Sequence, residues 1–112
     1  MRFDRLDRMT GGWFAGNFVP VAFASREFEV AVKRYRAGDY EPRHEHRLAT
    51  EITVVIEGSI RLGGRTLGAG EIVVLDPGDA TDFVALVDCV TVCVKSPSVP
   101  GDKHILDEAG DD

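Results

Sequence analysis

The most informative stretch of this chain is HEHRLATEITVVIEG, residues 44–58, in which two histidines precede a run of strand-forming residues. His44 and His46 are one residue apart, so on a strand both imidazoles project from the same face. Glu51 then arrives from the next strand after a short turn. Two neutral imidazoles and a carboxylate form a ligand set for divalent transition metals, with positions left for substrate. We therefore expect a metal site at His44, His46 and Glu51.

The run EITVVI, residues 51–56, is largely apolar on both of its faces. Residues 51, 53 and 55 share one face and residues 52, 54 and 56 share the other, because strand side chains alternate. A closed barrel covers only its interior, so the outer face needs a second layer. That layer is either the amino-terminal segment, with Trp13, Phe14 and Phe18, or another subunit. We expect a homodimer in which the amino-terminal segment takes part.

The rest of the chain is also predicted to form strands. Short β-rich runs recur between glycine or proline residues, at 28–36, 50–56, 59–62, 65–69, 71–75 and 81–95. Gly63 and Gly64 can supply the positive φ angles of a type I′ hairpin turn between two of these runs. A helical turn or two is expected only at residues 3–9, ahead of Gly11 and Gly12. Closely spaced strands of this kind indicate an antiparallel sandwich or barrel.

Composition and charge exclude several classes of protein. The chain has 112 residues, 44% of them apolar, so one domain with a self-sufficient core is expected. No apolar run approaches the roughly 18 residues that a membrane helix needs, so no membrane partner is expected. The charged amino terminus lacks the continuous apolar segment of an export signal, which predicts a cytoplasmic protein. The net charge of −6 provides no basic face for nucleic acid.

Cys89 and Cys93 lie in one predicted strand, which places their Cα atoms about 13 Å apart. A disulfide needs Cα atoms within about 7 Å, so these two cysteines cannot bridge each other. We expect both to be free, buried thiols that pack as small apolar side chains, and free thiols suit a reducing compartment.

The segment from Gly38 to Gly58 resembles a known family signature. The order Gly38, five residues, His44, one residue, His46, four residues, Glu51, six residues, Gly58 is that of the first signature of the cupin superfamily. Glycines suit the strand ends, where the chain turns without a side chain. The resemblance extends over residues 26–96. It implies an all-β fold, the double-stranded β-helix or cupin jelly-roll barrel, with a divalent metal held inside by the two histidines and the glutamate.

The second cupin signature is matched only in part. Gly70 and Gly78 stand where it has glycines, but Asp76 takes the place of its proline. Thr81 falls where the family supplies its third histidine, which is the fourth metal ligand, and Ala85 takes the asparagine position. A neutral threonine hydroxyl is a poor ligand for a transition metal. The resemblance therefore carries over only the three ligands of the first signature.

Thr81 leaves three alternatives open. The vacated position can hold water or substrate, because three ligands suffice for catalytic zinc or facial-triad iron. A substitute ligand can take it: Asp82 is adjacent but is expected to point away, and His104 would have to fold back over the barrel mouth. In the third alternative, the barrel binds no metal and is only a ligand pocket.

The sequence assigns no chemical role to the other polar residues near the two histidines. Arg43 and Glu45 alternate with the two histidines and should face away from the metal. Lys33 and Tyr35 alternate with Arg34, and without a strand register the sequence does not indicate which set lines the interior. No convincing additional acid or base is evident near the site.

These observations divide the chain into three parts. Residues 1–25 are expected to pack on the barrel or on a dimer partner, and residues 26–100 to form the cupin barrel. Residues 101–112, with five acidic residues and one lysine, are expected to form a solvated acidic tail.

Two functions from different classes remain. The leading hypothesis is an enzyme that depends on a divalent transition metal (Fe, Mn, Ni or Zn) and acts on a small polar metabolite, with chemistry of the oxygenase, isomerase or epimerase type that the resemblance implies. The alternative is a non-catalytic small-ligand-binding or regulatory barrel, which Thr81 and the lack of a further acid or base favour. Both predict a small-molecule partner.

Overall fold

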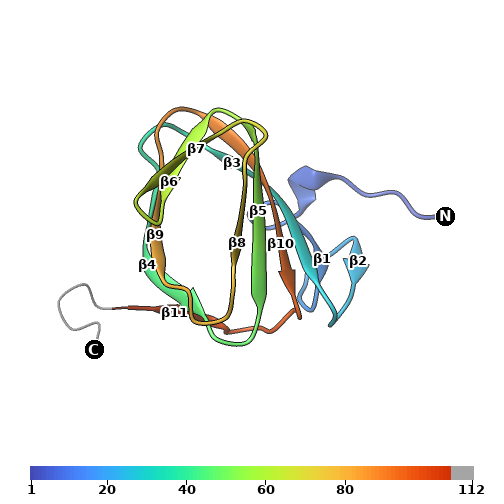
Figure 1. Cartoon of the computed structure of the whole chain (residues 1–112). Helices are drawn as coiled ribbons and strands as arrows, with labels where there is room; N and C mark the ends of the chain where they lie inside the picture. Colours follow the sequence, from blue (N-terminus) through green and yellow to red (C-terminus); the bar gives the residue numbers. More distant parts are fainter. Residues whose placement is uncertain (107–112) are drawn as a thin grey trace.

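The computed structural model describes residues 1–106 as two facing β-sheets and one short 3₁₀ helix, η1 (Leu6–Arg8). The first sheet contains β1 (Trp13–Gly16), β2 (Phe23–Ala24), β3 (Glu29–Tyr35), β5 (Thr50–Glu57), β8 (Ile72–Leu75) and β10 (Cys89–Ser96). The second contains β4 (Tyr40–His46), β6 (Ser59–Leu62), β7 (Arg65–Gly68), β9 (Thr81–Ala85) and β11 (Lys103–Ile105). Figure 1 shows the two sheets enclosing a common space, with η1 and β2 outside it. This architecture confirms the predicted all-β barrel.

Strand order places residues that are distant in sequence side by side. The first sheet runs β2-β1-β3-β10-β5-β8 and the second runs β11-β4-β9-β6-β7. All neighbouring strands are antiparallel except the parallel pair β1 and β2. Consecutive strands β4 and β5 belong to different sheets, so the turn between them carries the chain across one end of the barrel.

Glycines stand where the turns require them. Gly63 and Gly64 have φ angles of 58° and 70° between β6 and β7, which confirms the predicted hairpin. Gly58, the last glycine of the first signature, has a φ of 84°, and a Cβ atom there would collide with the carbonyl oxygen of Asp88. The signature glycine is therefore needed both for its backbone conformation and for a close approach between two chain segments.

The predicted run 81–95 is in fact two strands. β9 ends at Ala85 in the second sheet, and β10 begins at Cys89 in the first, so the intervening residues cross between the sheets. In this crossing, the carboxylate of Asp88 accepts a hydrogen bond of 2.9 Å from the backbone N–H of Ala37. The crossing contains neither glycine nor proline, so the sequence carried no punctuation signal for it.

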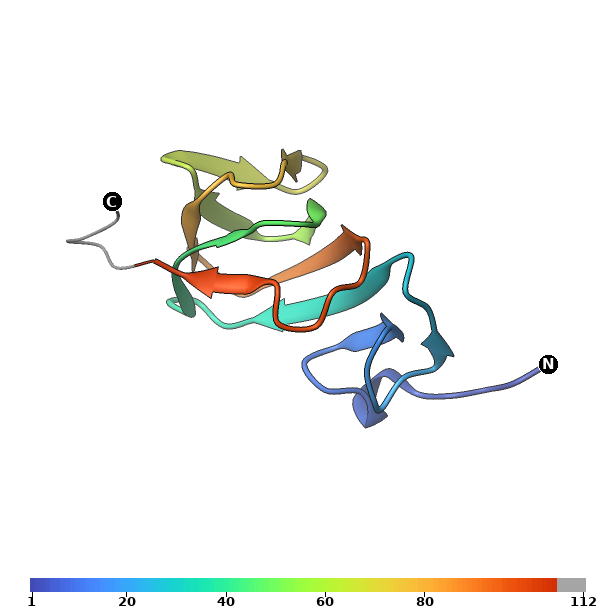
Figure 2. The same ribbon diagram turned by 90° about the horizontal axis from the view of Figure 1, so that it is seen from below.

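Segments at both ends of the chain add strands to the sheets. β1 pairs with β3, with Trp13 opposite Ala31, and so adds a strand to the first sheet instead of covering its outer face. β11 pairs with β4, with Ile105 opposite His44, so this part of the predicted acidic tail belongs to the barrel. Figure 2 shows β11 alongside β4 and the amino-terminal segment beside β3. The rest of the predicted tail, residues 107–112, lies outside the described residues.

The apolar core fills one end of the space between the sheets. Its members are Val55, Ile60, Leu62, Leu67, Phe83, Ala85 and Cys89. Tyr35 closes this cluster, with its ring centroid 4.6 Å from that of Phe83. The opposite end, where β5 begins and β4 ends, carries histidine, glutamate and lysine side chains instead. In residues 1–106, no helix has the length and apolar character that a membrane crossing requires.

Candidate metal centre

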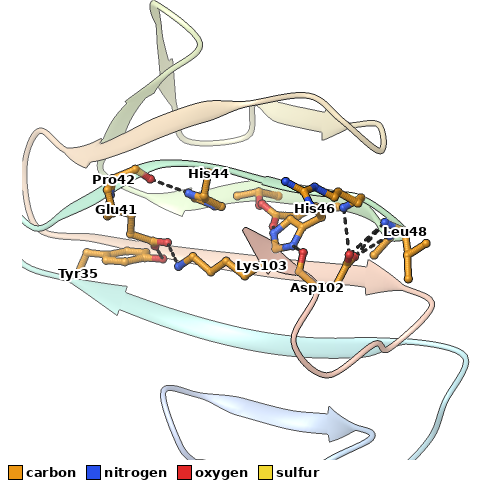
Figure 3. Close-up of polar contacts among 12 residues, drawn as sticks. Tyr35, Glu41, Pro42, His44, His46, Leu48, Asp102 and Lys103 are labelled. Carbon is orange, nitrogen blue, oxygen red and sulfur yellow. Dashed lines mark hydrogen bonds and ion pairs between the residues drawn. The ribbon is translucent and has the colours of Figure 1, made fainter. Parts of the chain in front are cut away.

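His44 and His46 project from β4 into the space between the sheets, as predicted. The two residues are 8% and 5% exposed, and their ring centroids lie 5.6 Å apart in an edge-to-face arrangement. Figure 3 shows His46 close to Asp102 and His44 nearer to Pro42. Glu45, which lies between them in sequence, forms an ion pair of 3.0 Å with Arg47 instead of joining the site.

Backbone carbonyls fix the ring nitrogens of both histidines. Nδ1 of His44 lies 2.8 Å from the carbonyl oxygen of Pro42, and Nδ1 of His46 lies 3.3 Å from that of Asp102. A carbonyl oxygen only accepts hydrogen bonds, so each Nδ1 donates its proton to that oxygen. Each neutral ring then keeps an unprotonated Nε2, which is the form in which imidazole binds a metal.

Glu51 of β5 meets His46 at the start of its strand. Its Oε1 lies 3.1 Å from Nε2 of His46, yet this buried Nε2 makes no hydrogen bond. Both atoms are acceptors when the ring is neutral, so their approach needs a proton or another cation between them. Burial raises the pKa of Glu51, but His46 and Lys95 outweigh it and hold that pKa below its ordinary value. Glu51 is therefore a carboxylate in the folded protein.

The donor set suits a transition metal, although the side chains are not gathered around one point. The Nε2 atoms of two neutral imidazoles and a carboxylate are suitable ligands, and Nε2 of His46 is buried without a hydrogen-bond partner, 3.1 Å from Oε1 of Glu51. Within the part of the chain that the structure describes, no three His, Cys, Asp or Glu side chains stand close enough to hold one ion. The structure thus joins His46 to Glu51 and places His44 beside them.

Thr81 lies beside His44, where the second signature has its histidine, but it offers no ligand to a metal. It lies directly opposite His44 on the neighbouring strand β9. Its Oγ1 accepts a hydrogen bond of 2.8 Å from the N–H of Gly63 and donates one of 2.7 Å to the carbonyl oxygen of Asp82. The hydroxyl is therefore engaged with the backbone, and the fourth ligand position of the family has no protein donor in this residue.

Neither substitute ligand considered from the sequence lines the cavity. Asp82 is exposed on the outer side of β9, as its alternation with Thr81 predicted. His104 lies opposite Glu45 on β11, and its Nε2 is 3.7 Å from Oδ1 of Asp102. Neither residue is therefore among those that line the cavity.

The site opens into a cavity of about 410 Å³ between the two sheets. Besides His44, His46 and Glu51, its walls carry ionisable and hydroxyl side chains that include Lys33, Tyr35, Glu41, Thr91, Lys95 and Lys103. The register of β3 therefore answers a question that the sequence left open, because Lys33 and Tyr35 face inward while Arg34 is exposed. A cavity of this size and polarity can accommodate a small polar molecule.

A second polar cluster, missed in the sequence, faces the same cavity. The hydroxyl of Tyr35 donates to Oε2 of Glu41 at 3.2 Å, and Nζ of Lys103 donates to Oε1 at 3.0 Å (Figure 3). Burial, followed by the charge of Glu41, raises the pKa of Tyr35, so the phenol keeps its proton. Burial also acts to raise the pKa of Glu41, but Lys103 outweighs it and the pKa is lowered.

Glu41 reaches the cavity because β4 is irregular. Strict alternation with His44 would turn Glu41 outward, but the pairing of β4 with β9 shifts register between these two residues. This bulge adds one residue to β4 and turns both side chains to the same face. Pro42 lies within the shifted stretch, and proline in a strand is typical of a bulge or an edge. It was the signal that could have revealed Glu41.

Asp102 fixes the segment that precedes β11 to the turn after β4. Its carboxylate accepts hydrogen bonds from the backbone N–H groups of Arg47, Leu48 and Ala49, at 3.0, 3.1 and 2.9 Å. Burial raises the pKa of Asp102, but these N–H donors outweigh it and the pKa is lowered. One residue thus holds the turn through its side chain and orients His46 through its carbonyl.

Both cysteines are free and buried, as predicted. Cys93 contributes to the cavity wall, where burial raises its pKa to about 12. Burial also raises the pKa of Cys89, which belongs to the apolar core. Each is therefore a thiol, and neither has the low pKa of a reactive cysteine.

Comparisons with known proteins bear on the fold. No protein-family model matches the sequence, and no curated protein matches it. Among solved structures, a protein with a double-stranded beta-helix domain from Klebsiella pneumoniae is 23% identical, with a TM-score of 0.63 over 69% of this chain and 69% of that chain. An RmlC-like cupin from Shewanella frigidimarina is 21% identical, with a TM-score of 0.62 over 69% of this chain and 71% of that chain.

A third solved structure is an enzyme. The DMSP lyase DddQ from Ruegeria pomeroyi is 24% identical, with a TM-score of 0.63 over 74% of this chain and 45% of that chain. At such identities, likeness in structure concerns the fold and not the reaction. The two facing sheets, their strand order and these three likenesses show that the chain has the cupin fold, the double-stranded β-helix that its first signature predicted.

Proposed function

We propose that this chain is a divalent-metal-dependent enzyme that acts on a small polar metabolite, with His44, His46 and Glu51 as its metal ligands. The observation that carries the proposal is the buried Nε2 of His46, which makes no hydrogen bond and faces the carboxylate of Glu51 at 3.1 Å. A bound Fe, Mn, Ni or Zn ion would supply a Lewis acid or, in the case of iron, a redox centre. A reaction of the oxygenase, isomerase or epimerase type belongs to this proposal.

The protein's own groups have distinct roles in this proposal. The backbone carbonyls of Asp102 and Pro42 accept hydrogen bonds from the Nδ1 groups of His46 and His44, which leaves Nε2 as the metal-binding atom of each neutral ring. Tyr35 and Lys103 flank Glu41 at the cavity wall, where a protonated phenol and an ammonium group can donate hydrogen bonds to a ligand. The fold is compatible with catalysis, because one solved structure that resembles the chain is a lyase.

Metal analysis of protein purified without an affinity tag, from cells supplied with Fe, Mn, Ni and Zn, tests the assignment. Wild-type protein should carry about one ion per chain, and His46→Ala should lose it. His104→Ala is the matched control, because His104 lies on the neighbouring strand but outside the cavity wall, and it should keep the ion. Metal-free wild-type protein, or equal metal content in His46→Ala, would contradict the proposal.

A non-catalytic ligand-binding or regulatory barrel is the second candidate, and two observations favour it. The hydroxyl of Thr81 is engaged with the backbone at the position of the fourth ligand. In residues 1–106, the candidate ligands also do not form a gathered group of three. This candidate predicts a metal-free protein in the same analysis, together with retained binding of a small molecule in the cavity.

We also propose that a second copy of the chain covers the outer face of the first sheet. Ile52, Ile56, Ile72 and Val74 are 42%, 48%, 62% and 53% exposed there. The amino-terminal segment reaches only the β3 side of this face, where Leu6 and Met9 share a surface pocket with Val32. A second copy offers the same exposed apolar side chains, so two copies can bury these side chains against each other. Sedimentation or light scattering of the purified chain tests this homodimer.

A cytoplasmic location completes the proposal. Cys89 and Cys93 are free thiols in the folded protein, which suits a reducing compartment. Fractionation of cells that express the chain should recover it with cytosolic markers, and recovery from an oxidising compartment would contradict this location.

A further inference from the structure

The inner face of the first sheet carries lysines in two different settings. In the strand register, Lys95 of β10 lies opposite Glu29 of β3 on one side and opposite Glu51 of β5 on the other. Four residues further along β3, Lys33 lies opposite Thr91 of β10. Because paired residues on one face are direct neighbours, Lys95 has a carboxylate on each side, whereas Lys33 has a neutral hydroxyl.

Both lysines reach the same aromatic ring at the cavity wall. Nζ of Lys33 lies 5.7 Å from the ring centroid of Trp13, and Nζ of Lys95 lies 4.9 Å from it. Lys33 is also 5.6 Å from the ring of Tyr35. An aromatic face attracts an ammonium group, but it offers no lone pair that could accept a hydrogen bond from that group. In residues 1–106, neither lysine forms an ion pair with a carboxylate, so their N–H donors remain available to a ligand.

The carboxylates of the cavity are engaged elsewhere. Glu41 accepts hydrogen bonds from Tyr35 and Lys103, and Glu51 faces His46. Burial is the largest effect on Glu29 and raises its pKa, so its negative charge is the least stable of the three. Lys33 helps to lower the pKa of Glu41, but within the described residues it forms no ion pair with any carboxylate.

Charge balance leads to the same conclusion. The cavity wall holds three lysines and three glutamates, and the carboxylate of Asp102 is turned to backbone N–H groups. A divalent ion at the candidate metal centre adds two positive charges to this balanced set. Charge that is removed from water must be compensated by an opposite charge or by hydrogen bonds. A ligand that carries a negative charge would supply that compensation.

We propose that the cavity binds an anionic small molecule, a carboxylate or a phosphate compound, and that Lys33, assisted by Lys95, holds its anionic group beside Trp13. This inference deepens the proposed function and rests on it, because it names the class of compound that the same site takes. An ammonium group binds carboxylate or phosphate oxygen through charge-assisted hydrogen bonds. Lys33 is then the residue that selects charged compounds over neutral ones.

Calorimetric titration of the full chain with inorganic phosphate, malonate and glucose tests this inference. Wild-type protein should bind phosphate or malonate, and the comparison of these two distinguishes a phosphate from a carboxylate ligand. Glucose should bind at least about tenfold more weakly. Lys33→Met should weaken binding of the preferred anion by about tenfold or more, whereas Lys33→Arg should restore most of it. Arg34→Met is the matched control, because Arg34 is the exposed neighbour on the same strand, and it should change nothing.

Each outcome supports or overturns the inference. Equal anion binding in wild type and in folded Lys33→Met overturns it, as does tighter binding of glucose than of both anions. If Lys33→Met fails to fold, the comparison of Lys95→Met with wild type provides the same test. Parallel metal analysis keeps the two proposals separate. Anion binding that depends on Lys33 in metal-free protein would uphold the anion site while the metal proposal failed, and intact metal content with no effect of Lys33→Met would do the reverse.

Discussion

The two faces of the sheet formed by β3, β10, β5 and β8 reverse the usual placement of polar and apolar residues. At one end of the barrel, the inner face carries the row Glu29, Lys95 and Glu51. The outer face carries two rows of branched apolar side chains, Val30–Val94–Ile52–Val74 and Val32–Val92–Val54–Ile72. The charged row lines a cavity, while several members of the apolar rows are exposed.

This contrast assigns a different task to each face. Charged groups are rarely enclosed unless they are paired, because their desolvation is costly, so an enclosed set of them indicates chemistry or ligand binding. Apolar side chains on a surface are common singly, but contiguous rows of them indicate an interface. The inner face also contains its own contrast, because the core around Ile60 fills the other end of the barrel. Stability and function are therefore located at opposite ends of the same strands.

The first prediction measures how much each face contributes to stability. Ile60→Ala, at a position that is 0% exposed, should lower the free energy of unfolding by about 2–5 kcal/mol, because it removes buried methyl groups and leaves a cavity. Ile72→Ala, at a position that is 62% exposed, should change it by only about 0.5 kcal/mol at protein concentrations where the chain is a monomer. Urea denaturation followed by circular dichroism measures both. Similar losses at both positions would remove the proposed difference between the faces.

The second prediction breaks the outer face as an interface. Ile72→Lys places a charge at the β8 end of an apolar row and should weaken dimer formation by about a hundredfold, because a buried unpaired charge is strongly unfavourable. Sedimentation velocity over a range of concentrations measures the dissociation constant. Ile105→Lys, on β11 of the other sheet and 58% exposed, is the control and should leave it unchanged. A wild-type chain that is monomeric at all concentrations would disprove the interface.

Local signals in the sequence account for what could be predicted. The first signature combines alternation, which turns His44 and His46 inward, with glycines at strand ends, and each of these is a property of a few neighbouring residues. The same alternation predicted that Asp82 points outward. For this reason the barrel, the hairpin at residues 63–64 and the approach of Glu51 to His46 could all be predicted from the sequence.

What the sequence missed depends on pairing between distant segments. Glu41 faces inward only because β4 shifts register against β9. Trp13 lines the cavity because β1 pairs with β3. Asp102 was assigned to a solvated tail, yet it binds the turn that begins at Arg47. None of these contacts leaves a periodic pattern in the sequence, because each joins segments that lie far apart along the chain.

The third prediction concerns the hydrogen bonds by which the Asp102 carboxylate holds the turn after β4. Asp102→Asn should lower the free energy of unfolding by about 1–3 kcal/mol, because the amide has one acceptor oxygen in place of the two that receive backbone N–H donors. Urea denaturation in the presence of a chelator measures this loss without any contribution from a metal. Asp82→Asn, at an exposed position on β9, is the control and should have little effect.

The effect of Asp102 should depend on pH in a defined direction. The pKa of Asp102 in the folded protein lies below its ordinary value of 3.8. As pH falls, the unfolded chain therefore takes up the proton first, and the stability that this carboxylate contributes is lost. The difference between wild type and Asp102→Asn should thus be full above the ordinary pKa and should shrink as pH falls through the folded one. A difference that stays constant down to low pH would show that the carboxylate charge is not what the N–H groups bind.

The smallest expected effect is on metal affinity and follows from substitution of Thr81, which lies opposite His44 in the β4–β9 pair. Thr81→His places a third imidazole beside the candidate ligands but also removes the acceptor of the Gly63 N–H group. Thr81→Ala removes the same hydrogen bonds without adding a ligand, so it is the proper reference. Against it, Thr81→His should bind Zn²⁺ or Ni²⁺ about tenfold more tightly in competition with a chromogenic chelator. Equal affinities would mean that a side chain at position 81 does not reach the point at which His44 and His46 would bind a metal.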